Sequence, residues 1–194
     1  TFSQSSFPLV PIGELLERIF YLGKLHRVFV DDAISGIPLL SISDVQKAKL
    51  SSDKYISKTL SRNIDDAMLS RGWVLISRVG TPGLAIYTRR EMEGFAGTDH
   101  LVRLVPNTKK ILPGFLFSVL SSPVGHHLLM GSEHGSVQLV LPPEYIEQIK
   151  IPLPQIGLQQ EINDLIERYG ESLTLASELE DQAQAKLSKA LVFE

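Results

Sequence analysis

The chain of 194 residues contains no cysteine. This absence excludes a disulfide framework and any zinc site with thiolate ligands, and it is typical of a reducing compartment. The sequence also lacks an apolar run long enough to span a bilayer and a basic-apolar-small signal pattern at its start. We therefore expect a cytoplasmic protein without a membrane contact. Because the chain begins at Thr1, we also expect it to be a piece of a longer protein.

A strong charge of either sign is missing too, since the net charge is −3. The charge is nevertheless uneven along the chain. Residues 1–155 hold 16 Lys and Arg against 14 Asp and Glu, a net +2, whereas residues 156–194 hold 3 against 8, a net −5. The body is thus slightly basic and the tail is acidic. Whole-chain charge therefore neither supports nor excludes a nucleic-acid partner.

Signatures of catalysis are missing as well. We find no nucleophile elbow, no Walker loop and no Asn-Pro-Pro-Tyr or Asn-Pro-Pro-Phe motif of a methyltransferase, and the PPEY run at 142–145 lacks the asparagine. Asp99 and His100 are adjacent, but no serine at a recognisable spacing completes a triad. The histidines between residues 126 and 134 fit no zinc or nuclease spacing. We predict no catalytic residue, no metal site and no cofactor bound by this chain.

Hydropathy patterns in residues 1–155 predict a globular body with an α+β fold, built from many short strands and helices. Runs rich in β-formers and bounded by turn residues predict strands over 27–30, 36–43, 73–78, 84–88, 100–105, 135–141 and 149–152. Helical spacing and proline at first-turn positions predict helices over 11–21, 63–70, 113–122, 123–130 and 144–148. We expect Asn63 to cap its helix, and the polar stretch 51–62 to be a loop.

The tail, residues 156–194, has a different pattern. From Gln159 onward it contains no proline and one glycine, and small or apolar residues recur every three or four positions, at Ile162, Leu165, Tyr169, Leu173, Ala176, Leu179, Ala183, Leu187 and Ala190. A stripe of about 30 residues predicts one long coiled-coil-type helix of roughly 45 Å. The stripe fits either a partner helix or the body itself. The length favours a partner helix, so we expect self-association through this segment.

Five segments together resemble a known family. In chain order they are 36–44 (GIPLLSISD), 72–83 (GWVLISRVGTPG), 97–106 (GTDHLVRLVP), 113–122 (PGFLFSVLSS) and 149–154 (IKIPLP), with Gln160 and Glu161 opening the long helix. Their order and spacing are similar to those of the specificity subunits of type I restriction-modification systems. The chain departs from the usual pattern at Trp73, where aspartate is common, and at Gln155, where leucine or proline is common.

The resemblance implies a sequence-specific DNA recognition domain over 1–155 followed by a spacer and dimerisation helix over 156–194. Such subunits normally hold two recognition domains and two helices, so this chain corresponds to half a subunit or a fragment. The domain would read one half of a split double-stranded target. The helix would pair with a second half or with itself and dock methyltransferase and restriction subunits, which use S-adenosylmethionine, ATP and Mg²⁺. A fused restriction-methylation enzyme and a non-DNA coiled-coil interaction protein are the alternatives.

Candidate DNA contacts follow from the need for cations at phosphates and polar groups at base edges. Arg78 and Thr81 flank a loop at Gly80 whose backbone N–H groups would approach a phosphate closely; the alternative is a plain hairpin turn. The remaining candidates lie on expected loops, and they are Arg89, Arg90, Lys109, Lys110, Lys54, Lys58, Arg62, His134, Ser136 and Gln138. For these residues, solvated surface, a linker or an ordinary strand-start loop are the alternatives.

Overall fold

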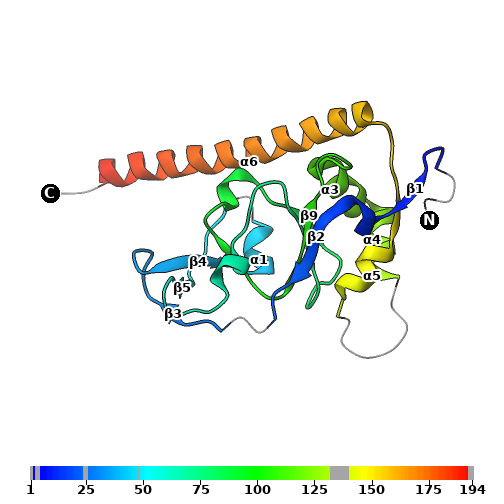
Figure 1. Ribbon diagram of the computed structural model, residues 1–194. Coiled ribbons are helices and arrows are strands. Elements are labelled where there is room, and N and C mark those ends of the chain that lie inside the picture. The colour runs from blue at the N-terminus through cyan, green and yellow to red at the C-terminus, as the bar shows by residue number, and fades with distance from the viewer. Residues whose placement is uncertain (1, 3–4, 24–25, 48, 132–139, 192–194) are drawn as a thin grey trace.

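The computed structural model describes residues 2, 5–23, 26–47, 49–131 and 140–191. A body of short strands and helices lies beneath one long helix, α6 (Ile156–Leu191), which crosses the whole body (Figure 1). This arrangement confirms the predicted α+β fold with a long C-terminal helix. Within the described residues, no helix is long and apolar enough to cross a membrane.

A four-stranded antiparallel sheet forms the centre of the body. Its strands stand in the order β2-β9-β6-β7, with bounds Leu16–Tyr21, Leu101–Pro106, Val74–Ser77 and Ala85–Tyr87. Alternate side chains of a strand point to opposite faces, and both faces here are buried: Val74 and Ile76 belong to one core cluster, whereas Leu75 belongs to another. The strands predicted over 73–78 and 84–88 are present as β6 and β7, and they pair as a hairpin.

Three helices cover the first of these cores, and each begins with a proline: α3 (Pro113–Ser121), α4 (Pro123–Met130) and α5 (Pro143–Gln148). Proline suits a first helical turn because the N–H that it lacks has no partner there. Beside them, β1 (Leu9–Pro11) pairs with β10 (Lys150–Pro152) and brings the two ends of the body together. Most of the strand predicted over 135–141 lies outside the described residues.

A second sheet, in the order β3-β5-β4-β8, lies at the opposite end of the body (Figure 1). Its strands span Phe29–Val30, Tyr55–Ser57, Gly36–Leu40 and Ala96–Gly97, and the short helices beside it are α1 (Ile42–Val45), α2 (Ile64–Ala67) and η2 (Arg90–Met92). β4 runs antiparallel to β5 and parallel to β8. A small core of Leu22, Leu39, Ile56, Ala67 and Ala96 holds this sheet together.

Several local predictions were wrong. Residues 11–21 form no α-helix; a 3-10 turn, η1 (Ile12–Leu15), leads into strand β2, because Ile19, Phe20 and Tyr21 pair with β9 and long-range pairing overrides local amphipathicity. The expected loop over 51–62 contains strand β5, which joins β3 to β4. Asn63 precedes α2 with a left-handed backbone, φ 57°, and its side chain makes no capping hydrogen bond.

Candidate nucleic-acid interface

An open groove of about 390 Å³ runs between α1 and the loop that follows β6. Its lining comes from three of the sequence segments singled out above, with Ser41, Ile42 and Ser43 from the first, Val79, Gly80 and Thr81 from the second, and His100 from the third. Gln46, two residues beyond the first segment, completes the lining. Segments that are far apart in the chain therefore meet at one place on the surface. Most of the lining residues are small or polar, although apolar atoms make up the larger part of the groove surface. Hydroxyl, amide and imidazole groups among them donate and accept hydrogen bonds.

The loop side of the groove is held in shape by Ser77. Its hydroxyl donates to the carbonyl of Thr81 and accepts from the N–H of Leu84 at 3.0 Å, while the N–H of Gly83 donates to the Ser77 carbonyl at 2.8 Å. Gly80 and Gly83 have positive φ angles of 83° and 78°, which glycine adopts without steric cost. The loop thus presents Gly80 and Thr81 to solvent in a fixed conformation.

The helical side of the groove is fixed by a capping box at the start of α1. The backbone N–H of Ser41 donates to Oδ2 of Asp44 at 3.0 Å, and Nζ of Lys47 donates to Oδ1 at 2.8 Å. Burial alone raises the pKa of the Asp44 carboxyl, but hydrogen bonds from Lys47 and Ser41 outweigh it and hold the pKa below its usual value. A capping box of this kind stabilises a short helix, which here carries Ser43 and Gln46.

Arg78 lies at the end of β6, next to the groove. Its guanidinium stacks 3.7 Å above the ring of Tyr21, and its backbone N–H donates to the carbonyl of His100 at 2.9 Å. Within the part of the chain that the structure describes, Arg78 takes part in no ion pair. Stacking on an aromatic face orients a guanidinium without neutralising it. This cation is therefore suited to bind a phosphate.

The other predicted cations do not gather at this groove. Lys54 and Lys58 flank β5 in the second sheet, where Nζ of Lys58 donates to the Ile34 carbonyl at 3.1 Å, and Arg62 is exposed nearby, its N–H bonded to the His26 carbonyl. Lys109 and Lys110 follow the far end of β9. Since His100 precedes that strand, its six residues put roughly 20 Å between these lysines and the groove.

Arg89 and Arg90 face the long helix instead. Arg89 is 5% exposed, pairs with Glu91, and lies with its aliphatic part against Gly170 of α6. Arg90 is exposed and 4.0 Å from Glu178 of the same helix. Neither residue lines the groove, so the DNA contacts predicted for Arg89 and Arg90 stay predictions. His134, Ser136 and Gln138 lie outside the described residues.

Four polar residues of the groove lining were not among the predicted contacts: Ser41, Ser43, Gln46 and His100. Tyr21, on which Arg78 stacks, was not among them either. Gln46 directly follows the first matched segment, so extending that segment by two residues would have included it. Tyr21 was missed because residues 11–21 were predicted to be a helix. His126, considered above as a metal ligand, forms a hydrogen bond with the Gly83 carbonyl at 3.1 Å through Nδ1. In the described ranges, no group of three or more His, Asp or Glu side chains is placed to hold a metal ion.

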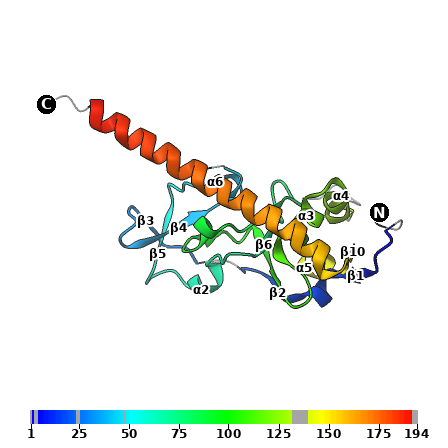
Figure 2. The ribbon, with the colours of Figure 1, turned by 90° about the horizontal axis from the view of Figure 1, so that it is seen from above.

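The long helix presents two different faces. Polar or small residues, Gln159, Asn163, Gly170 and Thr174, are buried against the body. The predicted apolar stripe lies mostly elsewhere: Ile162 and Leu173 are half-buried, whereas Leu165, Tyr169, Ala176, Leu179, Ala183 and Leu187 are exposed. The helix also extends past the body, since every residue from 181 to 191 is exposed (Figure 2). The helix therefore packs on the body through one face while its apolar face stays accessible.

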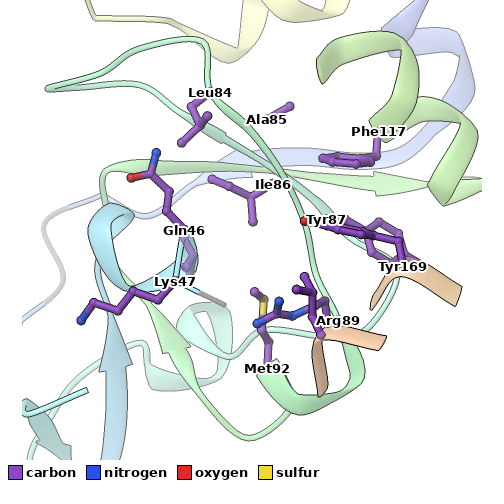
Figure 3. A pocket seen from close by; sticks show the side chains of 12 residues that line it. Gln46, Lys47, Leu84, Ala85, Ile86, Tyr87, Arg89, Met92, Phe117 and Tyr169 are labelled. Atoms are coloured by element: carbon purple, nitrogen blue, oxygen red, sulfur yellow. The ribbon is translucent and has the colours of Figure 1, made fainter. Parts of the chain in front are cut away.

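A second cavity, of about 380 Å³, lies where α1, β7, α3 and α6 approach one another. Figure 3 shows Tyr87, Phe117 and Tyr169 on one side and Gln46 and Lys47 on the other. The Tyr87 and Phe117 rings are 5.8 Å apart and tilted by 53°. This cavity adjoins the exposed apolar stripe of α6 through Tyr169.

The chain is thus a two-sheet body with a surface groove, packed beneath a long helix. The family described as the type I restriction modification DNA specificity domain matches residues 32–185, and the chain belongs to this family. The type I restriction enzyme EcoBI specificity subunit of Escherichia coli is 26% identical over 161 residues, which cover 82% of this chain and 33% of that protein. The chain thus spans about a third of the length of this curated relative.

Solved structures share the fold. The HsdS subunit from Thermoanaerobacter tengcongensis matches 96% of this chain and 47% of its own, with a TM-score of 0.60 and 18% identity. A chain from a study of complex assembly and conformational transition of a type I R-M system matches 97% of this chain and 49% of its own, with a TM-score of 0.59 and 18% identity. At this identity the likeness shows the fold alone.

Proposed function

We propose that this chain reads one half of a split double-stranded DNA target in the groove between α1 and the residue 79–81 loop. One observation carries the proposal: three separate family segments converge on a single groove. Arg78, which has no ion pair among the described residues, directly precedes the lining residue Val79 and is bonded through its backbone N–H to the lining residue His100. Membership of a DNA specificity family makes DNA the natural occupant of this surface.

The groove lining supplies the two kinds of contact that DNA recognition needs. Arg78 and the N–H groups around Gly80 bind phosphates and fix the register of the duplex, but they carry no sequence information. Ser43, Gln46 and His100 provide the hydrogen-bonding groups that read base edges; a glutamine pairs bidentately with adenine in the major groove. The target bases therefore depend on the α1 side of the groove and the affinity depends on the loop side.

The helix supplies the assembly function in this proposal. Its exposed apolar stripe, including Leu165, Leu179 and Leu187, pairs with the helix of a second specificity half or of a second copy. Methyltransferase and restriction subunits dock on the paired helices, and methyl transfer and DNA cleavage take place in those subunits with S-adenosylmethionine, ATP and Mg²⁺. This chain has no catalytic role in the proposal, and it acts in the cytoplasm, where the DNA is.

Cysteine protection tests the DNA surface directly, because the chain has no cysteine of its own. Thr81→Cys and His100→Cys place single thiols in the groove, and Thr108→Cys places a control thiol on the exposed turn after β9. With a mixed-sequence duplex at low salt, a thiol reagent should modify positions 81 and 100 several-fold more slowly, and position 108 at an unchanged rate. Equal rates with and without DNA at positions 81 and 100 would contradict the proposal.

The exposed stripe of α6 also favours a second candidate function, a protein-interaction scaffold without a DNA target. The same experiment separates the two functions. A scaffold would leave all three thiols unprotected by DNA while still associating through the helix.

A further inference from the structure

The face of α6 that meets the body carries polar or small residues. They are Gln159, Asn163, Glu167, Gly170 and Thr174, which recur every three or four positions and so lie along one side of the helix. The first three form hydrogen bonds with the body, whereas Gly170 packs against the aliphatic part of Arg89 and the Thr174 hydroxyl donates to the Gly170 carbonyl within the helix. An apolar helix face can slide or rotate on its support, because hydrophobic contact is not directional. Hydrogen bonds require particular distances and angles, so a polar face fixes the position of the helix more narrowly.

Two residues of this face, Gln159 and Asn163, cap the neighbouring helix α3. Oε1 of Gln159 accepts from the N–H of Leu112 at 3.1 Å, and Oδ1 of Asn163 accepts from the N–H of Gly114 at 2.8 Å. The first N–H groups of a helix have no partner within it, so side chains of α6 complete α3. A side chain at Gly114 would lie 2.9 Å from Cα of Asn163, which explains why glycine stands where the two helices touch.

The third hydrogen-bonding residue of this face is Glu167, which binds two residues of the body at once. Oε1 accepts from the hydroxyl of Tyr87 on β7, and Oε2 accepts from Nη2 of Arg71 at 2.6 Å. Tyr87 is 4% exposed, and the Glu167 side chain is 28% exposed. Both carboxylate oxygens are therefore engaged, on one side by the buried Tyr87 and on the other by Arg71, whose side chain is 43% exposed.

Toward its C-terminal end, α6 contacts the body through ion pairs. Glu171 is 4.0 Å from Arg71, Glu178 is 4.0 Å from Arg90, and Asp181 pairs with Lys49. Exposed pairs of this kind stabilise little by themselves. The half-buried Glu167 cluster is thus the strongest electrostatic contact between α6 and the body. The other acidic residues of the helix lie near cations of the body.

We propose that Glu167, Tyr87 and Arg71 form a positioning cluster that sets the angle between the recognition body and α6, and with it the separation at which two DNA half-sites are read. The second part rests on the proposed function. From Glu167 to Leu191 the helix runs roughly 36 Å at ~1.5 Å per residue. A tilt of about 5° at the cluster moves the helix end by roughly 3 Å, close to the ~3.4 Å rise of one base pair.

The angle is measured with spin labels at two introduced cysteines, Thr108→Cys on the body and Gln182→Cys on the exposed end of α6 outside the stripe. The labelled chain is diluted with unlabelled chain, so that the distances measured lie within one chain. We expect one narrow distance distribution for the otherwise unaltered chain, and a shifted or broadened one after Tyr87→Phe or Glu167→Gln. Both variants keep the size of the side chain, and Glu161→Gln, an exposed glutamate of the same helix, is the matched control. Circular dichroism checks that helix content is retained. An unchanged distribution in both cluster variants overturns the proposal.

The consequence for DNA is measured on the assembled complex with partner subunits and a second half. Selection from duplexes with randomised half-sites and variable spacing should return the same half-site sequence for Glu167→Gln as for the unaltered chain, but with a spacing preference shifted or widened by about one base pair, or ~3.4 Å. An unchanged spacing overturns the second part. If no half-site is enriched by any variant, the proposed function fails, while the spin-label distances still decide whether the cluster sets the angle.

Discussion

The guanidinium of Arg103 donates a hydrogen bond to the carbonyl oxygen of Gly97 at 2.8 Å inside the body, where Arg103 is 0% exposed. A second bond reaches the carbonyl of Leu101 at 2.9 Å. Arg103 belongs to β9 of the central sheet and Gly97 to β8 of the second sheet, so one side chain joins the two sheets. Burial lowers the pKa of Arg103 to about 10, which leaves it charged at neutral pH.

Replacing Arg103 with methionine should destabilise the body. The change leaves buried carbonyl oxygens without a donor, and an unpaired buried group costs about 1–3 kcal/mol. Arg103→Lys should cost less, because an ammonium group still donates. Chemical denaturation followed by circular dichroism measures both variants. A methionine variant as stable as the unaltered chain would mean that the cost of burying the guanidinium cancels its hydrogen bonds.

The capping box of α1 predicts a pH-dependent contribution to stability. At neutral pH, Asp44→Ala should lower the free energy of unfolding by about 1 kcal/mol, the usual value of a cap. Because the pKa of Asp44 is lowered in the folded state, this contribution is present above its unfolded pKa, near 3.8, and is lost as the pH falls through the folded value. The free energies of unfolding of Asp44→Ala and of the unaltered chain should therefore differ at neutral pH and become equal at acidic pH. Asp31→Ala, on an exposed turn, is the control, and a deficit independent of pH would contradict the assignment.

Neutralising Arg78 should weaken DNA binding in a salt-dependent manner. If this cation contacts one phosphate, Arg78→Gln lowers the slope of log affinity against log salt by about 0.9. Fluorescence anisotropy with a mixed-sequence duplex at several salt concentrations gives this slope. Lys109→Gln, at the far end of β9, should leave it unchanged. A slope identical to that of the unaltered chain would remove Arg78 from the interface.

The exposed stripe of α6 predicts self-association of the isolated chain. Burying a leucine stabilises an interface by about 1.5–3 kcal/mol, so Leu179→Gln or Leu187→Gln should each raise the dimer Kd by roughly tenfold or more. Ile156→Gln is the matched control, because Ile156 is 56% exposed but lies on the other side of the helix from Leu179. Analytical ultracentrifugation at tens of micromolar measures the association. A strict monomer for the unaltered chain would be inconsistent with the stripe as a pairing surface.

Local signals predicted much of the fold. Proline at a first helical turn placed α4 at Pro123–Met130, and the glycines at 80 and 83 predicted the tight loop that lies between β6 and β7. The strand β2 was mistaken for a helix, because its partner β9 lies more than 80 residues further along the chain. Strand pairing across a long sequence separation decides whether a segment of ambiguous pattern becomes a helix or a strand. Such pairing cannot be predicted from the residues of the segment alone.

The site was harder to predict for the same reason. Arg78 and Thr81 could be proposed from their own loop, whereas Gln46 and His100 reach the groove only after two sheets have packed together. Adjacent cations also differ in a way that composition does not reveal. Arg89 is buried beneath α6, whereas its neighbour Arg90 is exposed. Sequence reasoning identifies candidate cations, but burial decides which of them remain available to DNA.

The central claim, that the groove reads a DNA half-site, is tested most directly by selection from a randomised duplex library. The chain is first assembled with a candidate methyltransferase subunit, and the same selection is run with Gln46→Ala. We expect the unaltered complex to enrich one short half-site and the variant to lose its preference at one position of that half-site while still binding DNA. A complex that forms but enriches no sequence, or a variant whose selected half-site is unchanged, would contradict this account of the groove.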